Sequence, residues 1–312
     1  MEKQSKIFVA GHRGLLGASL IKELLAQGYA HLITRTHQEL DLTDRGKVNV
    51  FFRREKPEYV FLTAGRNGGI KANATYPADF FHANIAIQDS VFEAAQKNEI
   101  KHLVFYASSC IYPKISAQPM KEEYLLTGAI EPTSEGYAAA KIAGIFACRS
   151  YNNQHQTKRF IALVPNSMFG PNDHFDLDNA HVFSSLIRKF HEAKNTGERK
   201  IVLWGSGSPR REFVFVDDVA KASIFAMQNA GRLENIHYNI GSGQDFSIKE
   251  LAAMIVEVVG FKGNVEWNVS LPDGAPRKLL DSSRFLALGW RSQTEIMNGL
   301  RKTYEWYNRN SN

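Results

Sequence analysis

The sequence has no long apolar run and only two cysteines in its 312 residues. A transmembrane helix needs about 18 or more consecutive apolar residues, so we expect no membrane partner. Cys110 and Cys148 are too few for a disulfide framework and lack the spacing of metal ligands, so we expect no metal site. The amino-terminal stretch "MEKQSKIFVAG" has no long apolar core or cleavage site, which argues against a secretion signal. These features predict a protein of the reducing cytoplasm.

A strong imbalance of charge is also missing. The chain has 38 Lys and Arg residues against 32 Asp and Glu residues, a formal net charge of +6, and its basic residues are scattered. Proteins that bind nucleic acid usually gather basic residues on one helix or stripe, so we expect no nucleic-acid partner. An anionic small molecule such as a nucleotide suits the modest positive excess equally well. The 44% of hydrophobic residues is sufficient for a core.

The first half of the chain alternates strand-like with helix-like segments. This alternation predicts an α/β fold, a doubly wound parallel sheet with helices on both faces. Apolar strand-like runs occupy 6–11, 30–36, 56–65 and 101–109, and helical spacing of apolar residues occupies 15–28 and 84–100.

The second half has a different texture. A loop rich in Asn, Asp, Pro and Gly (166–181) precedes a predicted helix (182–194), a strand (200–207) and a further helix (247–260). We therefore expect a Rossmann-like, NADP(H)-binding domain over residues 1–165, with a returning segment near 212–240. A smaller substrate lobe is expected mainly over residues 166–312.

The segment "GHRGLLG" places Gly11, Gly14 and Gly17 between the first predicted strand and the first predicted helix. Glycines there permit a tight turn and let a pyrophosphate approach the free N–H groups and positive dipole at the start of the helix. The spacing differs from the G-x-G-x-x-G of many dehydrogenases. Its position between strand and helix nevertheless favours a dinucleotide site over a purely structural turn.

The residues after the second predicted strand indicate which dinucleotide to expect. NAD sites usually carry an acidic residue about 20 positions after the glycine turn, yet "ITRTHQ" supplies Arg35 and His37 instead. Arg13 lies within the glycine turn, and two arginines suit a 2′-phosphate. We therefore expect NADP(H), with Asp41 as a further cofactor-binding candidate. The alternative is that Arg35 is a solvated charge at a strand end.

A pair typical of carbonyl reduction follows in "SEGYAAAKIAG", where Tyr137 and Lys141 share one face of a predicted helix. The ammonium is expected to lower the phenol pKa and to hold the nicotinamide ribose, while the phenol protonates a carbonyl oxygen during hydride transfer. A hydroxyl of Ser108 or Ser109 would add a hydrogen bond to that oxygen. Because Tyr-x-x-x-Lys also occurs by chance, the assignment depends on the glycine turn and the Ser-rich strand end.

With these motifs the chain resembles the extended short-chain dehydrogenase/reductase superfamily and, within it, the GDP-L-fucose synthase family. The resemblance implies an enzyme that converts GDP-4-keto-6-deoxy-D-mannose to GDP-L-fucose by epimerising C3 and C5 and reducing C4 with NADPH. It also implies a homodimer. The matching blocks run from about residue 6 to residue 306 and include "GHRGLLG", "NGGIKANATYPADF", "SSCIYPK", "EPTSEGYAAAKIAG", "GPNDHF", "WGSGSPRREFVFVDD" and "PDGAPRKLLD".

The resemblance gives Cys110 a chemical role. A 4-ketone acidifies the hydrogens at C3 and C5, and inversion of those centres needs a base on one face of the sugar and an acid on the other. Cys and His exchange protons near neutral pH. The positions that match the family's acid/base pair are Cys110 and His181. Without the family, these residues are better explained as a core filler and a helix-start histidine.

The blocks that match the family's substrate lobe imply a site for the nucleotide diphosphate. Arginine is suited to bidentate phosphate contacts, and the candidates are Arg188, Arg211 and Lys278. Ser109 and Trp204 complete the expected substrate-binding residues. Each cation could instead be an ordinary surface charge.

Two departures from the family pattern leave the sugar open. Arg66 and Asn67 replace a common Lys-Val pair, and Ser167 replaces an Asn. The alternative is therefore a C4-reductase, with or without partial epimerase activity, for another GDP-4-keto-6-deoxy sugar such as a heptose or a 3,6-dideoxyhexose. From other classes, a non-catalytic nucleotide sensor and an NAD-retaining UDP- or dTDP-sugar epimerase also remain.

Overall fold

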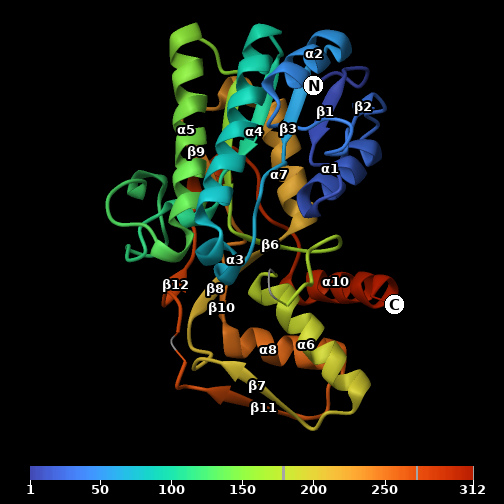
Figure 1. Ribbon diagram of the computed structural model, residues 1–312, viewed down its shortest axis with the longest axis vertical. Helices are drawn as coiled ribbons and strands as arrows, with labels where there is room; N and C mark the ends of the chain where they lie inside the picture. Colours follow the sequence, from blue (N-terminus) through green and yellow to red (C-terminus); the bar gives the residue numbers. More distant parts are fainter. Residues whose placement is uncertain (178–179, 272, 312) are drawn as a thin grey trace.

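A six-stranded parallel sheet forms the upper lobe of the molecule in Figure 1. The computed structural model describes residues 1–177, 180–271 and 273–311. All pairings in this sheet are parallel, as the sequence predicts. In spatial order the strands are β2 (Leu32–Ile33), β1 (Ile7–Ala10), β3 (Tyr59–Leu62), β4 (His102–Tyr106), β5 (Phe160–Pro165) and β9 (His237–Ile240).

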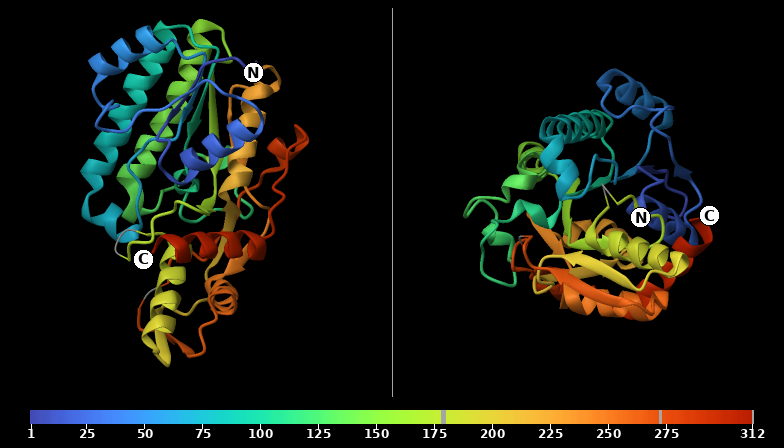
Figure 2. Two further views of the ribbon diagram at one scale, coloured as in Figure 1. Left: turned by 90° about the vertical axis from the view of Figure 1, so that its right-hand side faces the viewer. Right: turned by 60° about the horizontal axis from the view of Figure 1, so that its bottom comes forward.

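Helices cover both faces of this sheet (Figure 2). Ile7 and Val9 of β1 face the cluster formed with α1 (Leu15–Ala26) and α7 (Val216–Gln228). Phe8 and Ala10 face the opposite cluster. Strands buried on both faces are nearly continuous in hydrophobicity, which explains the uninterrupted apolar runs of the sequence. The second face is covered by α2 (Arg45–Glu55), α4 (Pro77–Lys97) and α5 (Glu135–His155).

The lower lobe is built around β8 (Arg210–Phe215), which pairs with three short strands, and around a separate two-stranded sheet. Phe213 and Phe215 of β8 enter a third apolar cluster with the helices of this lobe. Its other strands are β6 (Ser167–Phe169), β7 (Lys200–Trp204), β10 (Asp245–Ser247), β11 (Asn264–Asn268) and β12 (Arg277–Lys278), and its helices are α6 (Val182–Thr196), α8 (Ile248–Val259) and α10 (Ile296–Asn310).

The chain returns to the upper lobe after β8, because α7 and β9 pack into the parallel sheet. The domain limits stay a prediction. Short elements complete the structure: α3 (Ile70–Thr75), α9 (Ser283–Ala287) and the 3-10 turns η1 (Ser109–Ile111), η2 (Glu122–Tyr124), η3 (Pro132–Ser134) and η4 (Ala230–Arg232).

Several element bounds differ from the sequence-based expectation. The second strand shrinks to Leu32–Ile33 at the half-exposed edge of the sheet. Helix α4 begins at Pro77, at the first helical position that proline favours, instead of near residue 84. Helix α2 was not predicted, although Asp44 caps it by accepting from the Lys47 N–H. The expected loop 166–181 contains β6, and its residues 178 and 179 lie outside the described residues.

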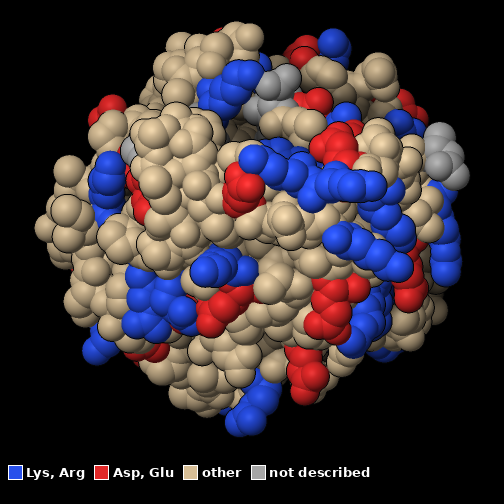
Figure 3. Space-filling model, turned by 90° about the horizontal axis from the view of Figure 1, so that it is seen from below, with Lys and Arg blue, Asp and Glu red and all other residues tan. Residues whose placement is uncertain are grey.

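The surface carries both signs of charge. On the face seen in Figure 3, Lys and Arg side chains are interspersed with Asp and Glu side chains. None of the helices in the described ranges is long and apolar enough to cross a membrane.

Candidate active site

A cavity of about 690 Å³ lies at the carboxyl ends of the central strands. Its walls come from the glycine turn after β1, from the segments that follow β2, β3, β4 and β5, and from residues of α4 and α5. The strand order reverses between β1 and β3, since β2 lies on one side of β1 and β3 on the other. Open α/β sheets bind ligands at such a switch point, beyond the carboxyl ends of the strands.

The glycine turn is shaped for close approach of a ligand. Gly11 has φ +87°, and a Cβ there would lie 2.7 Å from the backbone nitrogen of Ala64. A Cβ on Gly17 would lie 2.1 Å from the Gly11 carbonyl oxygen. Gly14 is the N-cap of α1, so all three predicted glycines meet at the start of that helix and line the cavity. The free N–H groups of the first turn therefore face the space where a pyrophosphate fits.

Two of the predicted cofactor-binding cations differ in their placement. Arg35 lines the cavity, with its guanidinium 2.8 Å from Glu55 and over the Phe51 ring at 5.5 Å. Arg13 is exposed and is not among the described residues that line the cavity.

The other two cofactor candidates, His37 and Asp41, both line the cavity, with 3.8 Å between the His37 Nδ1 and an Asp41 carboxylate oxygen. The Asp41 carboxylate accepts from the backbone N–H and the hydroxyl of Thr43, and these hydrogen bonds lower its pKa.

Ser108, Tyr137 and Lys141 line the same cavity. The Lys141 Nζ lies 5.7 Å from the centre of the Tyr137 ring. Burial raises the pKa of Tyr137, and a hydrogen bond with Ser108 opposes this only in part. Burial also lowers the pKa of Lys141 to about 8. The expected lowering of the Tyr137 pKa by Lys141 is therefore wrong for this structure, because the loss of water around the buried phenol raises its pKa.

Cys110 lies in η1, directly after the strand end that carries Ser108. Burial raises the pKa of its thiol, while a hydrogen bond with Ser108 and the charges of Lys278 and Lys141 act in the opposite direction. The thiol also acts on the pKa of Tyr137, which places both groups in one cluster. Cys148, in contrast, lies on α5 and is buried in the hydrophobic core.

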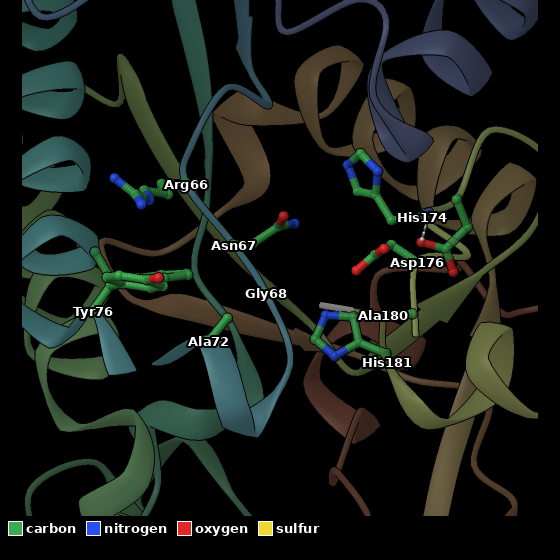
Figure 4. Close-up of a pocket in the computed structure, with 11 residues that line it drawn as sticks. Arg66, Asn67, Gly68, Ala72, Tyr76, His174, Asp176, Ala180 and His181 are labelled. Atoms are coloured by element: carbon green, nitrogen blue, oxygen red, sulfur yellow. Dashed lines mark hydrogen bonds between the residues drawn. The ribbon is translucent and has the colours of Figure 1, made fainter. Parts of the chain in front are cut away.

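His181 is the N-cap residue of α6 and lines the main cavity and an adjoining pocket of about 320 Å³ (Figure 4). In Figure 4, Asn67 points toward the side of this pocket where His174 and His181 lie. Asp173 lines both spaces, accepts from the Ser184 hydroxyl and the His174 N–H, and has its pKa raised by burial. His181 thus lies at this junction, whereas Cys110 is not among the described residues that line either space.

The departures from the family pattern also face this space, because Arg66, Asn67 and Ser167 line the main cavity. Arg66 makes a 3.0 Å ion pair with Asp79 and lies over the Phe80 ring. Both sets of departures are thus in a position to affect which ligand fits.

The predicted diphosphate cations are not among the described residues that line the cavity. Arg211 and Lys278 pair across β8 and β12, and burial lowers the pKa of both. Arg188 makes a 2.6 Å ion pair with Glu192 and donates to the Phe175 carbonyl. Trp204 ends β7 with 65% of its surface exposed. Ser109 lines the cavity as expected.

The chain matches the model of the NAD dependent epimerase/dehydratase family over residues 7–241. It belongs to this family. It is 51% identical over 307 residues to putative GDP-L-fucose synthase 2 of Arabidopsis thaliana, which covers 98% of this chain and 93% of the relative. It is 46% identical over 314 residues to the GDP-L-fucose synthase of Escherichia coli K12, with 98% and 97% covered. The predicted resemblance to GDP-L-fucose synthases is confirmed.

A solved structure of another family member is also similar along the whole chain. The GDP-mannoheptose C4 reductase of Campylobacter jejuni, solved with NADP bound, is 42% identical, with a TM-score of 0.90 and 99% of both chains covered. This similarity confirms the expected Rossmann-like architecture, with the second lobe appended to it.

One cavity residue that no sequence pattern predicted is Asn84 on α4. Its amide donates to the carbonyls of Arg66, at 2.8 Å, and Phe80, at 2.7 Å, so the side chain is fixed inside the cavity. A Cβ on Gly65 would lie 2.8 Å from the Asn84 Oδ1 and 3.5 Å from the Lys141 Nζ, so the two groups share one small space. The sequence does place Asn84 four positions after Phe80, so the two residues share one face of the helix. A polar residue on the face that carries a large apolar residue indicates a buried polar role.

Proposed function

We propose that the chain is an NADPH-dependent epimerase and reductase that converts GDP-4-keto-6-deoxy-D-mannose to GDP-L-fucose. The observation that carries the proposal is that Ser108, Tyr137 and Lys141 line one cavity, with the Cys110 thiol hydrogen-bonded to Ser108 behind them. The identity of 46% and 51% to two GDP-L-fucose synthases supports the same substrate.

The residues of the cavity fit an NADP(H) molecule. The glycine turn, where a Cβ on Gly11 or Gly17 would meet backbone atoms, would hold the pyrophosphate. Arg35 and His37 would face the 2′-phosphate, and Lys141 the nicotinamide ribose. When bound, NADPH supplies the hydride for C4.

For the reduction, Tyr137 donates its proton to the oxygen at C4 while Ser108 holds that oxygen by a hydrogen bond. Because burial raises the pKa of Tyr137, the phenol is protonated at neutral pH, as a proton donor must be. Lys141, with a pKa of about 8, carries a charge at neutral pH that stabilises the phenolate left after the transfer.

For the epimerisation, Cys110 and His181 exchange protons with C3 and C5. The neighbouring cations Lys278 and Lys141 favour the thiolate of Cys110 and so offset part of the effect of burial. The same Ser108 and Tyr137 hydrogen bonds that assist reduction would stabilise the enolate oxygen. One set of oxygen contacts therefore serves both steps.

The remaining assignments belong to the same proposal. Arg211 and Lys278 would bind the diphosphate, with Arg188 and Trp204 as further substrate contacts. A homodimer is supported by the exposed aromatic rings of Phe81 on α4 and Phe146 on α5, 44% and 41% exposed on two helices that pack together. The cytoplasm is the proposed location.

A second function is favoured by one group of residues. Arg66, Asn67 and Ser167 line the cavity and differ from the family's common pattern, and a GDP-mannoheptose C4 reductase is 42% identical. The chain would then reduce C4 of a related GDP-4-keto-6-deoxy sugar without complete epimerisation.

Incubation with GDP-4-keto-6-deoxy-D-mannose and NADPH in deuterated water, with NMR analysis of the product, separates the two functions. The leading proposal requires deuterium at both C3 and C5 of a fucosyl product. Cys110→Ala should lose this incorporation, whereas the matched variant Cys148→Ala, at the second and buried cysteine, should keep it. Reduction without deuterium at either carbon would leave the C4-reductase, and absence of NADPH oxidation with any GDP-keto sugar would contradict both.

A further inference from the structure

A buried chain of hydrogen bonds begins two residues after Cys110. The Tyr112 hydroxyl lies 3.1 Å from the His237 Nε2 and 2.5 Å from the Asn239 Oδ1. The His237 Nδ1 lies 2.8 Å from a guanidinium nitrogen of Arg149. His237 and Asn239 have no exposed surface, and Tyr112 exposes only 2%.

The direction of every hydrogen bond in this chain is determined. A guanidinium can only donate, so the His237 Nδ1 accepts from Arg149 and the Nε2 carries the ring hydrogen. That hydrogen points to the Tyr112 oxygen, and the Tyr112 hydroxyl donates to the Asn239 carbonyl oxygen. Burial and the charge of Arg149 lower the pKa of His237 to about 4, so the ring is neutral at neutral pH.

The chain connects three segments that carry the proposed site. Arg149 lies on α5, eight residues or about 12 Å beyond Lys141. Tyr112 directly follows η1, the turn that holds Cys110. The Asn239 amide donates to the carbonyls of Met120, at 3.0 Å, and Asp281, at 3.1 Å, and Asp281 is three residues beyond Lys278.

We propose that Tyr112, with His237 as its fixed partner, is a positioning residue for Cys110. The network holds the turn Ser109–Ile111 in a fixed place relative to α5, so that the thiol stays beside Ser108 and Tyr137. Loss of the Tyr112 hydroxyl leaves the His237 N–H and the Asn239 carbonyl unpaired in a buried space, which favours displacement of the turn. The positioning of the thiol follows from these hydrogen bonds, and only its part in epimerisation rests on the proposed function.

Tyr112→Phe tests the inference against Tyr238→Phe. Tyr238 lies on β9 between His237 and Asn239. It is also buried and accepts one hydrogen bond from the Glu234 N–H at 2.7 Å, on the opposite face of the sheet. Both variants therefore lose one buried hydroxyl, but only the first belongs to the network. The background is Cys148→Ala, so that Cys110 is the single thiol.

The first measurement is the rate of Cys110 alkylation by iodoacetamide as a function of pH, which needs no substrate. We expect Tyr112→Phe to change the alkylation rate, or the hydrogen-ion concentration at the midpoint of its pH profile, by a factor of about five or more. Tyr238→Phe should leave both quantities within about twofold. Equal profiles for the two variants, in protein whose circular dichroism is unchanged, would overturn the inference.

The second measurement is the ratio of deuterium incorporation at C3 and C5 to hydride transfer at C4. A displaced thiol should lower this ratio about tenfold or more, since small misplacements of reacting groups cost large factors in rate. His237→Gln keeps an acceptor for Arg149 and a donor for Tyr112 and should retain the ratio, whereas His237→Leu should lower it. If the unmodified protein incorporates no deuterium, the epimerase proposal fails and the alkylation profile alone decides the positioning role.

Discussion

Lys278 lies directly opposite Arg211 where β12 pairs with β8. Burial lowers the pKa of both side chains, and the charge of Arg211 lowers that of Lys278 further. The Arg211 guanidinium donates to the backbone carbonyls of Arg210, at 2.8 Å, and Ala275, at 2.6 Å. Two partly buried cations side by side repel each other and lose water, which destabilises the free protein, and a bound diphosphate would supply the missing negative charge.

Lys278→Met should therefore weaken the binding of GDP about tenfold or more and raise the melting temperature of the ligand-free protein. Calorimetric titration with GDP and thermal unfolding without it measure the two effects. The exposed Lys249 on α8 provides the control, because Lys249→Met changes the net charge equally. Unchanged GDP affinity in Lys278→Met would show that the diphosphate binds elsewhere.

Tyr137→Phe should reduce C4 about 10² to 10⁴ times more slowly, because it removes the proton donor and keeps the ring that packs against Phe80. The dissociation constant for NADPH should stay within about twofold, since the cofactor contacts that we propose lie elsewhere. Stopped-flow measurement of NADPH oxidation and fluorescence titration give the two numbers. A variant that reduces at the normal rate would remove Tyr137 from the mechanism.

The stability of the ligand-free protein should depend on pH through Lys141. Its pKa is lowered from an ordinary value near 10.5 to about 8, so between these pH values the unfolded chain binds more protons than the folded chain. The contribution of Lys141 alone therefore makes the protein more stable as the pH rises through this window. Below pH 8 the free-energy cost of burying the charged ammonium is present in full. That cost is at most about 3.5 kcal/mol, at about 1.4 kcal/mol per pKa unit.

Lys141→Met removes this group, so the variant should be more stable than the unmodified protein below pH 8. The difference should shrink toward pH 10.5. Urea unfolding of both proteins at a series of pH values measures this difference, in which the other titrating groups cancel. A difference independent of pH would mean that Lys141 keeps its ordinary pKa.

Arg35→Ala should weaken NADPH binding about tenfold or more and leave NADH binding nearly unchanged, since only NADPH carries the 2′-phosphate. Arg54→Ala is the matched control, because Arg54 also pairs with Glu55, at 2.9 Å, but is more exposed. Fluorescence titration of each variant with both cofactors is the measurement. Equal losses for NADPH and NADH would place the 2′-phosphate away from Arg35.

Much of the site followed from local patterns. The glycine turn occupies its expected place between β1 and α1, because a strand, a tight turn and a helix are encoded by consecutive residues. Tyr137 and Lys141 share a cavity because residues four apart share a helix face. The placement of Ser108 two residues beyond β4 also follows from the strand pattern.

Tertiary structure decided the rest. The strand and helix segments, the glycine turn and the Tyr137–Lys141 pair are readable from the sequence, since each depends on neighbours within a few residues along the chain. Long-range contacts pair Lys278 with Arg211 and bring Tyr112 to His237. The burial that raises the pKa of Tyr137 likewise comes from segments that are far apart in the sequence. Such contacts, and the loss of water that shifts a pKa, exist only after the segments pack together.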